Sequence, residues 1–211
     1  NVIKDGSASP ATAVEVLGGS DVVVKNLRAK EVAHAVRFQS VTSGKIVDVS
    51  TSTIGAGGGI ATDGTGILVS GGSSNEIRGN YLASPGEGGG NGIWIGSSDN
   101  NLVVDNEIAE PADAGIQLYD ADDNNVTGNE VDGDPTGQRP VRFGIRVGAF
   151  DAGRSDGNYV YDNDINGRSN IGFGTQGMLE GIVMRNGTGN EFERNSVRGV
   201  YNTAAVIDDD D

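Results

Sequence analysis

Three short segments of the chain place an aromatic ring, an amide and a guanidinium at the same point of a shared pattern. Trp94, Gln117 and Arg146 each follow a Gly-Ile pair and precede another aliphatic residue. An indole offers a flat apolar face to a sugar ring, while the amide and guanidinium offer donors to hydroxyls or carboxylates. The combination is typical of sugar recognition. The alternative is that Trp94 packs under a neighbouring loop such as 83–91.

Alternate positions of these segments extend the predicted binding surface. Successive side chains of a strand point to opposite faces, so residues between inward Ile and Val side chains face outward. The predicted substrate-binding residues are Arg37, Trp94, Gln117, Tyr119, Arg146 and Arg185. Charged residues of the adjoining loops flank them: Glu87, Glu110, Asp113, Asp134, Arg139, Arg142 and Glu180.

The overall charge restricts the classes of partner. The chain of 211 residues has 30 Asp plus Glu against 15 Lys plus Arg, for a net charge of −15. A phosphate backbone would be repelled, so nucleic acid is not an expected partner. No apolar run approaches the 18 or so residues of a membrane span. With no Cys and one His, disulfides, thiolate zinc sites and a His-based triad are not expected.

The basic residues are also unevenly chosen. All four Lys lie within the first 45 residues, and the remaining basic residues are Arg. Acidic, Lys-poor surfaces are typical of proteins from halophilic microbes, where high salt screens the repulsion between carboxylates. The alternative is an ordinary acidic secreted protein. Separately, we expect an extracellular or cell-surface location.

An internal repeat provides the elements that position these side chains. The pattern is Asn, any, apolar, any, any, Asn, any, apolar. Its five copies begin at Asn75, Asn101, Asn124, Asn158 and Asn190. The second Asn of each copy falls at a corner, where Asn tolerates the left-handed conformation and its amide can bond the neighbouring repeats. We therefore predict a structural ladder of Asn80, Asn106, Asn129, Asn163 and Asn195.

Each repeat contains three short strands, because a Gly-Ile strand precedes each pair of Asn-linked strands. The spacing from this Ile to the first Asn is 8 residues, as from Ile67 to Asn75, except in the fourth repeat, where the segment 148–157 holds a five-residue insertion. Strands this short bury little alone, but stacking them creates a continuous core. The pattern predicts about seven to eight stacked turns, called rungs below.

The chain resembles the right-handed parallel β-helix proteins of the pectate-lyase-like superfamily over about residues 14–207. The resemblance implies an all-β fold: a single-stranded, right-handed parallel β-helix of three sheets, with the Asn corner between the second and third sheets. It also implies that the Gly-Ile strands form the first sheet, beside which carbohydrate-active members bind substrate. Residues 1–211 are expected to form one β-helix domain with an acidic end at 208–211, within a longer chain.

Catalysis is a weaker expectation. A β-helix lyase needs a base beside a uronate carboxylate, and Arg146 or Arg142 would serve, although no Lys follows Lys45. Asp134 and Glu110 are loop carboxylates available for acid–base roles. The motifs of polygalacturonate-hydrolysing relatives are not intact, so the sequence leaves open whether a lyase, a hydrolase or no enzyme is present.

A second column of charge falls on the third sheet. Glu107, Glu130 and Asp164 each follow the corner Asn, which would stack three carboxylates about 5 Å apart. Such a column could bind Ca²⁺, which takes six to eight oxygen ligands. The alternative, which we favour, is a solvated acidic face that is destabilised at low salt by like-charge repulsion.

Two functions remain open. The first is an extracellular carbohydrate-interacting module that binds, and in one version cleaves, a polysaccharide along the first sheet. The second is a non-catalytic surface solenoid, such as a stalk, filament or spike subunit, that associates with itself through the ends of the coil.

Overall fold

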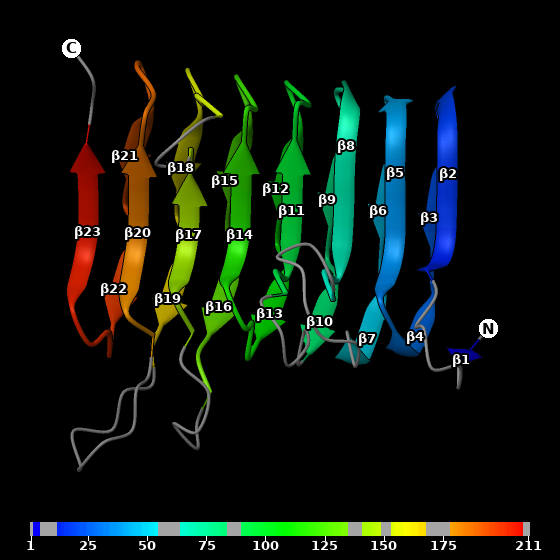
Figure 1. Cartoon of the computed structure of the whole chain (residues 1–211), viewed down its shortest axis with the longest axis horizontal. Coiled ribbons are helices and arrows are strands. Elements are labelled where there is room, and N and C mark those ends of the chain that lie inside the picture. Colours follow the sequence, from blue (N-terminus) through cyan, green and yellow to red (C-terminus); the bar gives the residue numbers. More distant parts are fainter. Residues whose placement is uncertain are drawn as a thin grey trace.

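The strands are short and numerous because each repeat turns the chain three times. The computed structural model describes residues 2–4, 12–54, 64–83, 90–134, 141–148, 153–167 and 178–208, which form 23 strands. Within these residues there is no helix, and hence none that is long and apolar enough to cross a membrane. The strands are arranged in three parallel sheets that run along the long axis of the molecule (Figure 1).

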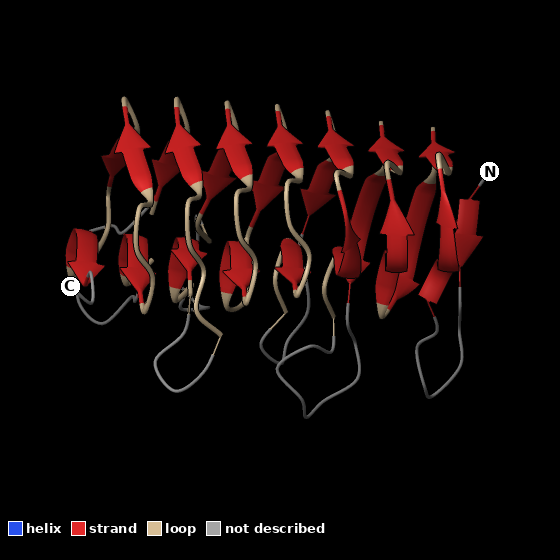
Figure 2. Ribbon diagram, turned by 90° about the horizontal axis from the view of Figure 1, so that it is seen from above, coloured by secondary structure: helices blue, strands red, loops and turns tan. Residues whose placement is uncertain are grey.

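Consecutive strands belong to different sheets, and each strand pairs with the strand three positions later (Figure 2). The first sheet contains β2 (Thr12–Ser20), β5 (His34–Thr42), β8 (Ile67–Ser73), β11 (Ile93–Gly96), β14 (Ala114–Tyr119), β17 (Phe143–Val147), β20 (Glu180–Arg185) and β23 (Thr203–Asp208). The second contains β3 (Val23–Lys25), β6 (Lys45–Val47), β9 (Glu76–Arg78), β12 (Leu102–Val104), β15 (Asn125–Thr127), β18 (Tyr159–Tyr161) and β21 (Glu191–Glu193). The third contains β1 (Val2–Lys4), β4 (Arg28–Val32), β7 (Ser50–Ile54), β10 (Tyr81–Ala83), β13 (Glu107–Ala109), β16 (Glu130–Asp132), β19 (Asp164–Asn166) and β22 (Ser196–Arg198). The predicted three-sheet parallel solenoid is confirmed.

The core follows from the period-two pattern. In the six rungs from β5 to β20 of the first sheet, one inward residue from each stacks on the next, and every member of the column is at most 4% exposed. The column consists of Val36, Ile67, Ile93, Ile116, Ile145 and Ile182. Stacking gives each aliphatic side chain a partner above and below, so apolar area that one rung would leave in water is buried.

The predicted Asn ladder lies between the second and third sheets. Each Asn Nδ2 donates to the Oδ1 of the next Asn at 2.8–2.9 Å, from Asn80 through Asn106, Asn129 and Asn163 to Asn195. The first ladder amide, Asn80, also accepts from the backbone N–H of Val49 at 2.9 Å. The ladder therefore satisfies backbone groups that would otherwise be buried without partners.

The first Asn of each repeat forms a second ladder, which the sequence analysis did not predict. This ladder lies between the first and second sheets and is joined by Nδ2-to-Oδ1 bonds of 2.8–3.1 Å. Its members are Asn75, Asn101, Asn124, Asn158 and Asn190. The signal was available in the sequence, since this Asn always lies five residues before the corner Asn. Residues at equal positions of a solenoid repeat stack above one another.

The expectation that the corner Asn adopts the left-handed conformation is wrong. The residue before it does so: Asp105 and Asp162 have φ of 53°, and Gly79 has φ of 62°. This residue turns the corner and donates its backbone N–H to the next rung, as Asp105 does to the Thr127 carbonyl. The following Asn is then free to direct its amide along the coil axis.

Candidate functional site

The outward rows of the first sheet have the predicted register. Trp94 pairs with Gln117, and Gln117 pairs with Arg146 on the next rung. A second row beside it pairs Gly96 with Tyr119. Rungs in a parallel sheet are about 4.8 Å apart, so β11, β14 and β17 bring these side chains onto one face. We call this surface, made by Trp94, Gly96, Tyr119 and Arg146, the first-sheet face.

Trp94 and Tyr119 form an aromatic pair on the first-sheet face. Their ring centroids are 6.3 Å apart and their planes differ by 25°. Trp94 lies folded over Gly96, because a Cβ added to Gly96 would be only 1.9 Å from Cη2 of the indole. Gly96 thus gives the indole space to lie along the sheet, and the two half-buried rings form nearly parallel faces on adjacent rungs.

The insertion of the fourth repeat contacts this pair. A Cβ added to Gly153 would lie 2.8 Å from the Tyr119 ring, so this part of the loop packs directly against the ring. The loop continues into Arg154 and Asp156, whose side chains form an ion pair at 2.8 Å. The insertion therefore packs against the Tyr119 ring and limits its movement.

Gln117 lies in the predicted row but is only 4% exposed. Its Nε2 donates to the Gly148 carbonyl at 3.4 Å and to the Leu118 carbonyl at 3.5 Å. A side chain buried in this way supports the sheet and is not presented to a ligand. The alternation of the strand predicts which way Gln117 points but not what covers it.

Arginines and a carboxylate gather around Phe143, at the start of β17. The guanidinium groups of Arg142 and Arg146 lie 5.4 and 5.0 Å from the Phe143 ring centroid. Arg142 also approaches Asp113, with Nη1 and Oδ1 3.4 Å apart. Phe143 was not predicted as part of this cluster, because it lies just before the Gly-Ile pair of its strand. Its bulky apolar side chain at the start of β17 could have indicated a packing site for the neighbouring arginines.

Burial controls the protonation of this cluster. Desolvation raises the pKa of the Asp113 carboxyl, although the positive charges of Arg142 and Arg146 oppose the rise. Desolvation likewise lowers the pKa of the Arg146 guanidinium, with Asp113 acting in the opposite direction. Asp113 is therefore a carboxyl that holds its proton to a higher pH than a solvated one.

The other predicted arginines have partners of their own. Arg185 is mostly buried, with its Nη2 3.9 Å from Oε2 of Glu180. Arg37 is bound by Glu15 at 3.0 Å and by the Gln39 amide oxygen at 3.3 Å. Arg37 also lies two rungs from Trp94, through Leu68, so it is peripheral to the first-sheet face.

Glu110 and Asp134 lie just after the third-sheet strands β13 and β16, on consecutive rungs. The backbone N–H of Glu110 donates to the carbonyl of Asp132 at 2.8 Å, and Asp134 follows two residues later and is 4% exposed. They precede β14 and β17 in the chain, as predicted for loop carboxylates. Glu87 and Arg139 lie outside the described residues, as do residues 209–211 of the acidic end.

The carboxylate column on the third sheet has the predicted register. Glu130 pairs with Glu107 on one side and Asp164 on the other. Burial raises the pKa of Glu130, and the charges of Asp132, Glu107 and Asp164 raise it further. Across the described ranges, no three His, Cys, Asp or Glu side chains are arranged to hold a metal ion. The raised pKa of Glu130 is what mutual repulsion on a solvated acidic face would produce.

A family model for a right-handed β-helix region matches residues 12–176. A comparison with curated proteins yields no match.

Among solved structures, the chain is similar to the A-module of the mannuronan C-5 epimerase AlgE6 of Azotobacter vinelandii, at 18% identity and a TM-score of 0.52. That match covers 98% of this chain and 58% of the module, so the chain spans less than two thirds of it. The surface protein and adhesin PfbA of Streptococcus pneumoniae is similar at 12% identity and a TM-score of 0.53, over 88% of this chain and 66% of that one. The Dettilon tailspike protein is similar at 12% identity and a TM-score of 0.52, over 89% and 45%. At these identities the likeness is one of fold.

Proposed function

This chain belongs to the right-handed β-helix family, and we propose that it binds a polysaccharide along its first-sheet face. Trp94 and Tyr119 would provide stacking surfaces for successive sugar rings. Arg146 would donate hydrogen bonds to hydroxyl or carboxylate groups of the same glycan. Gln117, Arg37 and Arg185 would act indirectly, since each is buried or already bound by a neighbour.

The aromatic pair is the single observation that carries the proposal. Two rings 6.3 Å apart and 25° from parallel lie on consecutive rungs and bring aromatic surface to the first-sheet face. The apolar faces of sugar rings stack on such surfaces, while the sugar hydroxyls remain available for hydrogen bonds.

The neighbouring charges give the same face acid–base potential. Asp113 retains its proton to a higher pH than usual, as a proton donor to a leaving group requires. Arg142 lies beside it at 3.4 Å and would stabilise the carboxylate after proton loss. Arg146, Arg142, Asp134 and Glu110 remain the proposed acid–base residues from the sequence, to which the structure adds Asp113. Binding is the core of the proposal, and bond cleavage is its extension.

The similar structures support a polysaccharide partner and an extracellular setting. By their names, one is an epimerase of mannuronan, one is a surface adhesin and one is a tailspike. The acidic composition supports a further part of the proposal, which is that the protein works at high salt, as halophilic proteins do.

The test is a glycan array followed by calorimetric titration, in about 2 M salt to screen repulsion. Wild type is compared with Trp94→Ala, and with Tyr161→Ala as the control. Tyr161 belongs to another aromatic pair, on the second sheet, where it packs 4.7 Å from Tyr159 and beneath Arg194. We expect Trp94→Ala to raise the Kd at least about tenfold, which corresponds to about 1.4 kcal/mol, and Tyr161→Ala to leave it unchanged.

Equal losses in both variants would show that the effect is not specific to the first-sheet face. No binding to acidic or neutral glycans would favour the alternative of a structural or adhesive solenoid. A depolymerisation assay on any bound polysaccharide, with Asp113→Asn alongside, then determines whether the protein cleaves what it binds.

A further inference from the structure

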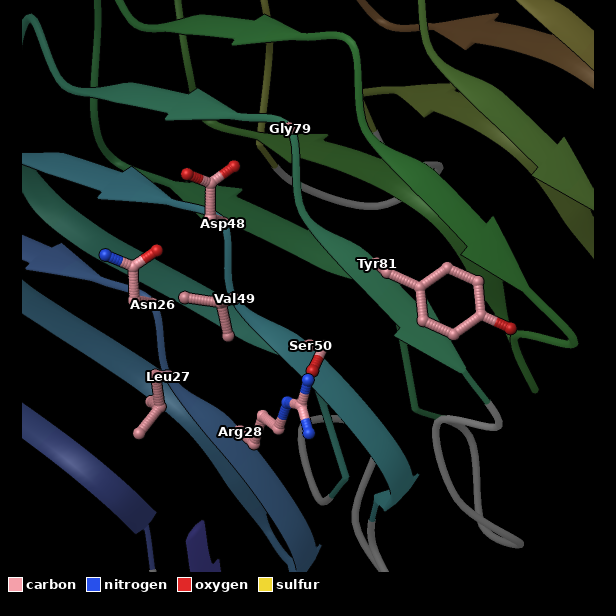
Figure 3. Close-up of a pocket in the computed structure, with 8 residues that line it drawn as sticks. All are labelled: Asn26, Leu27, Arg28, Asp48, Val49, Ser50, Gly79 and Tyr81. Carbon is pink, nitrogen blue, oxygen red and sulfur yellow. The ribbon is translucent and has the colours of Figure 1, made fainter. Parts of the chain in front are cut away.

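A cavity of about 450 Å³ lies at the corner between the second and third sheets, away from the first-sheet face (Figure 3). Its lining comes from three successive rungs and includes the side chains of Asn26, Arg28, Asp48, Ser50 and Tyr81. The volume falls within the range of small-molecule sites.

The register explains why the surface is hollow there. Ser50 pairs with Arg28 on one side and with Tyr81 on the other, so the three occupy one outward row of the third sheet. Rungs are about 4.8 Å apart, which separates the strands of Arg28 and Tyr81 by about 10 Å. The small serine between two large side chains leaves a gap with a guanidinium on one wall and a phenol ring on the other.

The turns before these strands add polar groups at the edge of the gap. Asn26 and Asp48 both have φ of 53°, in the left-handed region that marks each corner of this coil. Figure 3 shows their side chains projecting from successive turns beside Val49, with Ser50 and Arg28 farther along the same strands. One end of the pocket thus offers an amide and a carboxylate, and the strands beyond it offer the hydroxyl and the guanidinium.

The chemistry of this lining selects one class of ligand. The charged groups are one cation, Arg28, and one anion, Asp48, so the site has no net charge to attract a phosphate or a metal ion. Its donors and acceptors are mixed, and Tyr81 is 43% exposed although it is a large aromatic side chain. A ring with an apolar face and several hydroxyls satisfies all of these groups together.

We propose that this cavity is a second binding site, specific for a single neutral sugar residue. The sugar ring packs against Tyr81 above Ser50, and its hydroxyls bond Arg28 and Asp48. The site is independent of the polysaccharide surface proposed above, because it uses different rungs and a different face of the coil.

The probes are the methyl glycosides of glucose, galactose and mannose, with sodium glucuronate as the anionic comparison. Each is titrated into ¹⁵N-labelled protein while amide resonances are followed. We expect saturable shifts at residues 26–28, 48–50 and 79–81 with at least one neutral glycoside. Tyr81→Ala should raise the Kd about tenfold or more.

Two matched substitutions test the gap itself. Ser50→Leu fills it and should abolish the shifts, whereas Ser196→Leu, at the same row position but on β22, should leave them unchanged. Trp94→Ala should also leave them unchanged, which separates this site from the first-sheet face. The amide spectra show directly that each variant is folded.

Three results would overturn the assignment. The first is the absence of saturable shifts at these amides with every neutral glycoside. The second is wild-type affinity in Ser50→Leu. The third is tighter binding of glucuronate than of all neutral probes, which would identify an anion site instead.

Discussion

Removing one amide from the middle of the corner ladder tests how much the ladder stabilises the coil. Asn129 is 1% exposed, and its Oδ1 accepts from both the backbone N–H and the Nδ2 of Asn106, at 3.0 and 2.9 Å. Its Nδ2 faces the carbonyls of Val103 and Thr127 and the Oδ1 of Asn163. Asn129→Ala deletes all of these contacts at once.

The cost follows from the groups left behind. The backbone N–H of Asn106 loses the side-chain acceptor that faces it, and an unsatisfied buried donor costs about 1–3 kcal/mol. The remaining lost hydrogen bonds contribute about 1 kcal/mol each, partly offset where Asn106 Nδ2 keeps the Ile77 carbonyl. We therefore expect a loss of about 5 kcal/mol in the free energy of unfolding. At this chain length that lowers the Tm by about 10–20 °C.

Denaturant and thermal unfolding, followed by circular dichroism, measure the loss. The fluorescence of Trp94, the single tryptophan, provides a second probe from another face of the coil. The control is Asn125→Ala, on the same rung, whose Oδ1 has no hydrogen-bond partner among the described residues. It should change stability by no more than about 0.5 kcal/mol. Similar losses for Asn129→Ala and Asn125→Ala would refute the reasoning.

Three further substitutions test the first-sheet face and the acidic surface. Gly96→Ala should displace the indole of Trp94, since the new Cβ would lie 1.9 Å from Cη2; we expect a shifted fluorescence spectrum and weaker glycan binding, with stability changed by less than about 1 kcal/mol. Asp113→Asn should raise the Tm near neutral pH and have no effect at acidic pH, because burial raises the pKa of Asp113 and the folded protein loses stability as the pH rises through that pKa. The same difference in Tm between variant and wild type at both pH values would contradict this. Glu130→Gln should stabilise the protein at low salt and less so in about 1 M salt, because its neighbours repel its charge; a gain independent of salt would argue against repulsion.

The fold could be predicted from the repeat alone, because a solenoid converts local spacing into spatial position. Each rung contacts only its neighbours, so residues at equal positions of the repeat must stack. The spacing of 8 residues from Ile67 to Asn75 thus predicted the strands and the inward column, and the second Asn of each repeat predicted the corner ladder. The same logic predicted the register that aligns Trp94 with Gln117 and Arg146.

The burial and contacts of these side chains could not be predicted from the repeat. Alternation gives the direction of a side chain but not its cover, which is why Gln117 is buried while Trp94 and Tyr119 form a surface. Burial raises the pKa of Asp113, and the arginines that oppose this rise lie one rung later in the chain. The cavity beside Tyr81 depends on Ser50 lying between two larger side chains on adjacent rungs. Side-chain packing and solvation are set by neighbours across rungs, and a repeat pattern specifies which residues are neighbours without specifying how they fill the space between them.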